Sequence, residues 1–302
     1  MGFRFFEKNK AICMLAVAAC LMMMVFPEIT VTASKSAIRI WMNAVVPSLL
    51  PFMVVAGYIK RAGVSAMTSS RFYPAVMAFF SGYPMGAKMA GDQYRDGLLD
   101  EAGLKRVLSY AMITGPAFLT GGIGVTFYQN KTAGYVLACS HYAAAAICGL
   151  ILGRGTKIPE QKIHRHRGSG TMSGETPFTD SILESFRSLG IVLAYILLFM
   201  IGAAFLDISD LFQSMPDWAS AFCKGLLEMT VGCSEIARCS CSLRMKLVLS
   251  SFLISFGGLS VTGQTMSMLK GCPVKPGQIL TIKILHGALS AIWTFTICAF
   301  VV

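Results

Sequence analysis

Long runs without a charged residue constrain this chain more than any other feature. Five segments contain no Asp, Glu, Lys or Arg: Ala11–Pro27, Ile40–Ile59, Val107–Asn130, Ser188–Leu206 and Leu247–Leu269. Thr132–Gly153 contains none either, and Pro276–Val302 contains only Lys283. A helix of about 20 apolar residues crosses a hydrocarbon core of about 30 Å. The runs therefore predict an all-α polytopic membrane protein with about seven transmembrane helices.

The composition argues against soluble and enzymatic classes. Of the 302 residues, 55% are hydrophobic and 14% are charged, whereas about a quarter of a soluble domain is charged. The sequence has no nucleophile elbow, phosphate-binding loop or His-Glu-x-x-His motif. Cys239-Ser240-Cys241 has one residue between its thiols, which is a poor spacing for zinc. We therefore expect no enzyme, no cofactor and no metal site.

The first apolar segment, Ala11–Phe26, has the outline of a secretory signal. It follows Arg4, Lys8 and Lys10, and Val31-Thr32-Ala33 resembles a cleavage site. Because the rest of the chain is itself multispanning, we expect a retained first helix; a cleaved signal peptide is the alternative.

The distribution of Lys and Arg in short loops predicts a cytoplasmic N-terminus and an external C-terminus. In this orientation the external loops contain Asp207, Asp210 and Asp217, and most basic residues are cytoplasmic. Three basic residues oppose the rule: Arg238, Arg244 and Lys246. The net charge of +11 is therefore mainly a topology signal, and the expected partner is the lipid bilayer, not nucleic acid. A homo-oligomer is compatible with the sequence.

The chain repeats itself once. Ser36–Gly57 resembles Ser181–Gly202, and His141 corresponds to His286, at the same shift of 145 residues. Internal repeats locate the substrate site in many transporters. We predict an N-terminal membrane helix and loop over 1–34, a first repeat over 35–153 and a second over 180–302. Residues 154–179, which are basic and rich in Gly and Ser, read as a cytoplasmic linker, with contact to anionic lipid as the alternative.

Each repeat contains an apolar segment that fits a re-entrant hairpin. Phe72–Ala87 is uncharged, too short to cross twice, and interrupted by Gly82 and Pro84. Its counterpart surrounds Gly232. With three full crossings in each repeat, the second half is inverted relative to the first, which is a recurring plan of secondary transporters.

Four interruptions of the helical runs mark the candidate site. They are Ser81-Gly82-Tyr83-Pro84, Thr114-Gly115-Pro116, Gly232-Cys233-Ser234 and Phe256-Gly257-Gly258-Leu259-Ser260. Gly permits the turn, Pro suits the first turn of a new helix, and Ser234 could cap another. The free N–H groups at such helix starts favour an anion. Simple kinks are the alternative, but breaks paired across a repeat favour a substrate site.

Ionisable residues in the apolar runs add further candidates. Lys88 and Arg238 each lie one turn after a break, where they face an anionic ligand or extend to the interface. Glu235 either pairs with Arg238 or binds a coupling cation. His141 and His286 either bond a neighbouring helix or contact a proton or ligand. Lys283 is expected near the cytoplasmic end of its helix.

The same residues carry a family resemblance. Ser81-Gly82-Tyr83-Pro84-Met85-Gly86-Ala87-Lys88, Thr114-Gly115-Pro116 and Ala138-Cys139-Ser140-His141-Tyr142 resemble the sporulation integral membrane proteins of YlbJ type. These belong to a wider group with a nucleoside-recognition or Gate domain, which includes spore maturation proteins and ferrous-iron transporters. The resemblance covers about Lys35 to Cys298, more loosely in the second half.

The resemblance implies a role in endospore formation and passage of dipicolinic acid across a forespore membrane. It places the site at Gly82, Tyr83, Pro84, Lys88, Thr114, Gly115, Pro116 and His141; the second-half residues rest on the internal repeat alone. We therefore expect a transporter or facilitator of a small anion in a membrane of a spore-forming bacterium. A transporter of nucleosides or related polar metabolites, and a non-transporting scaffold needed for spore maturation, are the alternatives.

Overall fold

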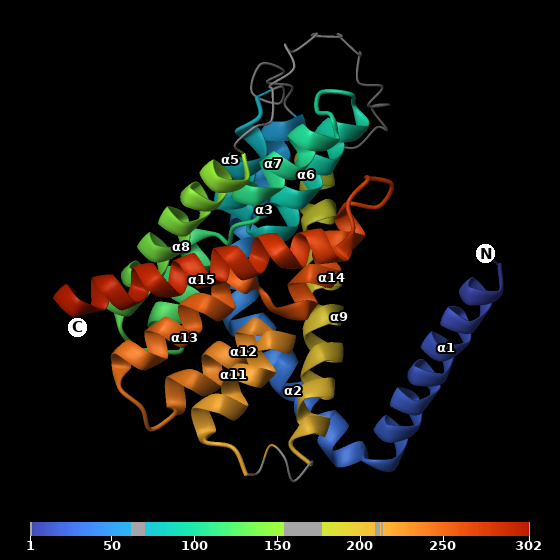
Figure 1. Ribbon diagram of the computed structural model, residues 1–302, viewed down its shortest axis with the longest axis vertical. Helices are drawn as coiled ribbons and strands as arrows, with labels where there is room; N and C mark the ends of the chain where they lie inside the picture. Colours follow the sequence, from blue (N-terminus) through green and yellow to red (C-terminus); the bar gives the residue numbers. More distant parts are fainter. Residues whose placement is uncertain (1, 62–69, 154–176, 209–211, 213, 302) are drawn as a thin grey trace.

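The computed structural model describes residues 2–61, 70–153, 177–208, 212 and 214–301, and every regular element in this part is a helix. Five helices are long and apolar enough to cross a membrane: Pro27–Val55, Lys131–Leu152, Pro177–Leu206, Leu243–Met268 and Pro276–Val301. Two further predicted spans correspond to the short apolar helix Cys13–Val25 and to a broken helix described below. The chain is thus an all-α polytopic membrane protein (Figure 1).

The order of elements occurs twice after α1 (Gly2–Val25). The first half consists of α2 (Pro27–Ile40), η1 (Trp41–Val45), α3 (Val46–Arg61), the hairpin α5 (Tyr73–Ser81) and α6 (Tyr83–Arg95), the broken pair α7 (Glu101–Ala111) and η2 (Phe118–Val125), and α8 (Lys131–Leu152). The second half consists of α9 (Pro177–Leu206), the hairpin α11 (Asp217–Leu227) and α12 (Met229–Arg238), the broken pair α13 (Leu243–Phe256) and α14 (Gly258–Met268), and α15 (Pro276–Val301). Each half therefore reads helix, hairpin, broken helix, helix.

The first helices of the two halves pack against each other in opposite directions. The ring of Phe26, just before α2, lies 6.3 Å from that of Phe205 near the end of α9. At the other end, the ring of Tyr58 in α3 lies 6.0 Å from that of Phe178 at the start of α9. Figure 1 shows the continuous helix α2–α3 alongside α9.

The last helices of the two halves, α8 and α15, also run antiparallel. His141 contacts His286, whereas Cys148, further along α8, lies against the carbonyl of Ile282, earlier in α15. Corresponding helices of an inverted repeat point in opposite directions, so both pairs agree with the predicted inversion.

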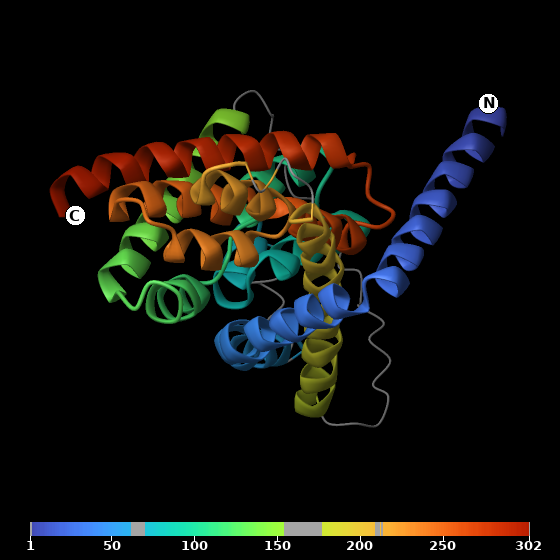
Figure 2. The same ribbon diagram turned by 90° about the horizontal axis from the view of Figure 1, so that it is seen from below.

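The N-terminal region differs from the prediction. Residues 27–34, expected to be a loop, are helical and begin α2, because Pro27 suits the first turn and the Thr30 hydroxyl bonds the carbonyl of Phe26. The helix α1 projects away from the other helices (Figures 1 and 2). Its apolar side chains, such as Leu15 and Met24, are more than 70% exposed, as expected of a helix that faces lipid. The basic stretch 154–176 lies outside the described residues.

Candidate functional site

The first hairpin turns at Gly82 and packs against the break in the next helix. Gly82 has φ of 81°, a left-handed value that favours glycine, and it separates α5 from α6. Pro84 lies in the first turn of α6, as predicted. A Cβ atom on Gly115 would lie 3.2 Å from the carbonyl oxygen of Phe79. The chain resumes a helical turn at Pro116, so the first tip and the first break form one junction.

The second half builds the same junction with different residues. Gly257 and Gly258 have φ of 82° and 74°, and they separate α13 from α14. A Cβ atom on Gly258 would lie 2.9 Å from the carbonyl oxygen of Leu227, the last residue of α11. The second hairpin tip therefore meets the second break, as the first tip meets the first.

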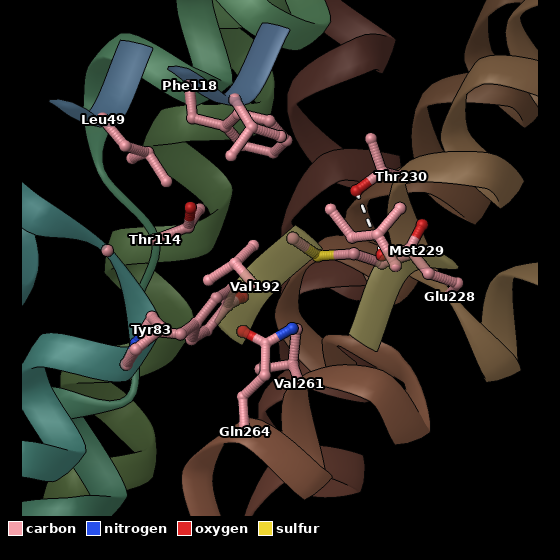
Figure 3. A pocket seen from close by; sticks show the side chains of 14 residues that line it. Leu49, Tyr83, Thr114, Phe118, Val192, Glu228, Met229, Thr230, Val261 and Gln264 are labelled. Carbon is pink, nitrogen blue, oxygen red and sulfur yellow. Dashed lines mark hydrogen bonds between the residues drawn. The ribbon is translucent and has the colours of Figure 1, made fainter. Parts of the chain in front are cut away.

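A small cavity lies between the two tips. Its volume is about 40 Å³, which is room for a few water molecules. Figure 3 shows Tyr83 and Thr114 on one side and Met229 and Thr230 across from them, with Gln264 below. Most of the wall is aliphatic or aromatic. The lining residues are Val45, Leu49, Gly82, Tyr83, Pro84, Thr114, Phe118, Val192, Ile196, Glu228, Met229, Thr230, Val261 and Gln264.

The two helix starts at the tips are satisfied differently. No side-chain hydrogen bond caps α6, whose first residues Tyr83 and Pro84 line the cavity. In contrast, Glu228 caps α12: its carboxylate accepts from the Val231 N–H at 2.9 Å and from the Thr230 hydroxyl at 3.2 Å. The carboxylate of Glu228 thus occupies the start of α12. The start of α6 has no capping side chain.

The predicted break at Gly232 is wrong by about one turn. The helix α12 runs without interruption from Met229 to Arg238, and the cap is Glu228, not Ser234. Gly232 serves close packing instead, because a Cβ atom there would lie 2.3 Å from the Cα atom of Gly225 in α11. The two helices of the second hairpin cross at this pair of glycines.

Lys88 lies near the base of the first hairpin rather than in the tip cavity. Its ammonium pairs with Glu184 of α9, which also accepts from Arg61 at 2.9 Å. These side chains line an open hollow of about 600 Å³ together with Asp180 and Arg187. Lys88 therefore lies in an open hollow lined by charged side chains beside the first hairpin.

Arg238 and Glu235 lie at the base of the second hairpin. Glu235 pairs with Lys224 at 3.0 Å, and Lys224 also pairs with Asp207 at 2.8 Å. Arg238 lines the same open hollow, of about 370 Å³, and contacts the Ser234 hydroxyl. The predicted pair of Glu235 with Arg238 is replaced by the pair of Glu235 with Lys224, because Lys224 faces it across the hairpin.

The helix α9 is thus tied to both hairpins at its opposite ends. Glu184, near its start, binds Lys88 of the first hairpin. Asp207, directly after its last residue, binds Lys224 of the second hairpin. A movement of either hairpin relative to α9 has to break an ion pair.

His141 and His286 are buried in the contact between α8 and α15. His141 Nε2 accepts from the backbone N–H of Thr114 at 3.1 Å, so its Nδ1 is placed to donate to the Ser255 hydroxyl at 2.8 Å. His286 Nε2 donates to the carbonyl oxygen of His141. These bonds favour the structural interpretation of both histidines, and His141 joins the backbone of the first break to a side chain beside the second.

The structure brings part of the predicted site together. Gly82, Tyr83, Pro84 and Thr114 line the cavity. The other predicted residues lie at its supporting junctions or at the hairpin bases: Lys88, Gly115, Pro116, His141, Gly232, Ser234, Glu235, Arg238, Gly257, Gly258 and His286. Glu228 and Gln264 were not predicted. A carboxylate between Leu227 and Met229 was the signal for Glu228, because a lone charge in an apolar segment needs a partner.

Comparisons with known proteins agree with the resemblance in the motifs. The chain is similar to "Sporulation integral membrane protein YlbJ" of Bacillus subtilis (strain 168), with 22% identity over 88% of this chain and 77% of the relative. No family model matches the chain, and no solved structure matches it. The predicted relationship to YlbJ-type proteins is confirmed by this homologue.

Proposed function

Starting from the homology with a sporulation integral membrane protein, we propose that this chain acts in endospore formation as a transporter of a small anion. Dipicolinic acid, a planar dianion, is the leading substrate. The supporting observation is that both hairpin tips and the first helix break line one small cavity, while the second break packs against the second tip. Irregular backbone at membrane depth is tolerated where it is buried in protein or lines a wet cavity, and secondary transporters place substrates at such breaks.

The small size of the cavity supports a closed arrangement within the proposed transport cycle. A volume of about 40 Å³ does not admit a ring with two carboxylates, so substrate entry requires the tips to separate. The hairpin bases are where such movement is controlled, because Lys88 and Lys224 join them to opposite ends of α9. Breaking one pair while keeping the other would open one side at a time.

Positive charge at the first hairpin supports an anionic substrate. Arg61, Lys88 and Arg187 line the open hollow at its base; Asp180 and Glu184 pair with two of them there, so three cations against two carboxylates leave a net positive charge that attracts anions. Beyond them, the start of α6 beside the cavity has no side-chain cap, and the positive end of its helix dipole favours an anion.

One observation favours the second candidate, a nucleoside or another neutral polar metabolite. The cavity contains Glu228, and its other polar side chains include the neutral Thr114, Thr230 and Gln264. A buried carboxylate repels an anion but accepts hydrogen bonds from hydroxyl or amide groups. A non-transporting scaffold, the third alternative, would leave these polar groups without a ligand to bind.

Uptake into proteoliposomes tests the proposal. Terbium inside the vesicles reports dipicolinate that enters, and radiolabelled uridine tests the second candidate in the same preparation. We expect wild type to accumulate dipicolinate, and Gly82→Leu to lose at least about 90% of that uptake, because a side chain at φ of 81° strains the tip. Lys88→Ala should raise KM more than it lowers kcat.

Gly190→Leu is the matched control, since Gly190 has open space around its Cα and should transport as wild type does. If wild type takes up neither solute, the transport proposal falls and the scaffold remains. Uptake of uridine without dipicolinate selects the second candidate. Normal uptake by Lys88→Ala removes only the role of Lys88.

A further inference from the structure

Lys283 is a buried cation that the proposed transport path does not use. It lies in α15 and is 0% exposed, so its ammonium does not extend to the surface of the protein. Burying an ammonium group is costly unless other groups replace its water. Among the described residues, none of the ion pairs includes Lys283. Its partners must therefore be dipoles and π electrons.

Those partners come from both breaks. Lys283 Nζ donates to the carbonyl oxygen of Met112 at 3.2 Å and to that of Ser255 at 3.4 Å. Met112 directly follows α7, and Ser255 lies at the end of α13. The last carbonyl groups of a helix lack helical partners and form the negative end of its dipole. One ammonium group thus joins the carboxyl ends of both broken helices.

The first hairpin tip completes the site. Lys283 Nζ lies 3.6 Å from the centroid of the Tyr83 ring, within the range of a cation–π contact. The Tyr83 hydroxyl donates to the carbonyl of Ile254, next to Ser255. Because Tyr83 also lines the cavity, the charge on Lys283 acts on a residue of the candidate substrate site.

Other titratable groups surround this ammonium. His141 and Cys148 face it from α8, His286 from its own helix and Tyr83 from α6. None is a carboxylate, so losing the proton from Lys283 leaves no unpaired anion. Lys224 differs, since its two carboxylate partners hold it charged.

We propose that Lys283 is the binding site of a coupling proton. Unwound carbonyls and half-helix carboxyl ends are the usual ligands of the coupling cation in secondary transporters, and here the ammonium of Lys283 takes that place. With the proton bound, the charge holds both breaks and the first tip together. Without it, the two helix ends and the Tyr83 ring lose their common cation and can separate. The coupling role of this proton rests on the proposed transport function, but the proton site itself does not.

Hydrogen–deuterium exchange of the purified full-length protein in nanodiscs tests the site without any substrate. The readout is exchange in peptides covering 108–118 and 252–260 between about pH 6 and pH 9, corrected for the intrinsic pH dependence of exchange. We expect corrected exchange at both breaks to rise at least about tenfold toward the alkaline end in wild type. Lys283→Gln, which retains a donor without charge, should show the high exchange at every pH. Lys283→Arg, which stays charged, should show the low one.

Lys105→Met is the control, because Lys105 pairs with Glu101 at an exposed position, outside both peptides, and its loss should cost little stability. It should leave the pH profile of both peptides unchanged. A flat profile in wild type overturns the proposal. So does a wild-type profile that persists in Lys283→Gln, which would assign the titration to His141 or His286. If Lys283→Gln does not fold, a pH profile in Lys283→Arg equal to that of wild type overturns it.

Transport separates this inference from the proposed function. In dipicolinate uptake, Lys283→Arg should lose the response to an imposed pH gradient and keep uptake down the substrate gradient. A protein that shows the exchange result but moves no solute keeps the proton site and loses the transport proposal. Solute uptake by a protein with flat exchange profiles would keep the transport proposal and overturn the proton site.

Discussion

His286 Nε2 donates a hydrogen bond to the backbone carbonyl oxygen of His141, and the two atoms are 2.9 Å apart. These residues correspond to each other in the repeat, so the two halves of the chain are joined through equivalent positions. Their rings lie 4.6 Å apart. The contact is not symmetric, because His141 uses its own nitrogens for Thr114 and Ser255.

Removing the donor of this pair should destabilise the protein. His286→Leu removes the hydrogen bond that the His141 carbonyl oxygen accepts in addition to its bond within α8, a loss of about 0.5–1.5 kcal/mol. The midpoint of thermal unfolding in detergent should therefore fall, whereas His286→Gln, which keeps a donor, should unfold closer to wild type. Equal midpoints for the Leu and Gln variants would show that the hydrogen bond is not what His286 contributes.

The glycine crossing in the second hairpin predicts a steep response to a single methyl group. Gly232→Ala places a Cβ atom 2.3 Å from the Cα of Gly225, and moving the two backbones apart should cost about 1–3 kcal/mol. Gly202→Ala is the control, because open space surrounds Gly202 in α9 and Ala favours a helix by up to about 1 kcal/mol. Thermal unfolding midpoints that shift in the same direction for both variants would contradict this packing role.

The Lys224 ion pairs should matter more than an exposed pair of the same type. Lys224 has a side chain only 10% exposed, and Lys224→Met removes the cation that Asp207 and Glu235 share. We expect a loss of about 1–2 kcal/mol, reduced from the value for a fully buried pair because the carboxylates are partly exposed. Lys105→Met, which breaks an exposed pair with Glu101, should cost at most about 0.5 kcal/mol. A chemical denaturation series comparing the two variants decides between these values.

Glu228→Gln separates the two candidate substrates by the sign of its effect. Removing the negative charge from the cavity should lower KM for dipicolinate by about threefold to tenfold, because a like charge near the anion is lost. The same change should raise KM for a neutral solute that donates a hydrogen bond to the carboxylate. Glu235→Gln, at the base of the same hairpin, controls for a general effect of charge. A higher KM for dipicolinate in Glu228→Gln would argue against anion transport.

The sequence was most informative where one residue determines the local backbone. Gly82 and Pro84 predicted the first tip, because a left-handed turn favours glycine and the first turn of a helix tolerates proline. The class of protein followed from hydrophobicity in the same direct way, and the duplication was predicted from matched residues such as His141 and His286. The second tip was misplaced because no Gly or Pro marks it. There the chain turns at Glu228, whose side chain caps the helix that follows.

Contacts between distant segments were beyond the sequence. Lys283 reads as an interfacial lysine from its neighbours, and its burial depends on carbonyls that lie 171 and 28 residues away. The partners of Lys88 and Glu235 were also missed, since helical spacing does not reveal which side chains face each other across a hairpin. The order of local elements was therefore predictable, and the pairing of charges was not.

The contacts of Lys283 and His286 also constrain how the two halves can change over time. Each half supplies groups that satisfy buried backbone of the other: Lys283 and His286 bond the carbonyls of Met112 and His141, and Tyr83 bonds that of Ile254. A half expressed alone would expose these unmet carbonyls together with the apolar face of its missing mate. The duplicated halves therefore need each other to fold. Whether a substitution in one half is tolerated depends on the residues that it contacts in the other half.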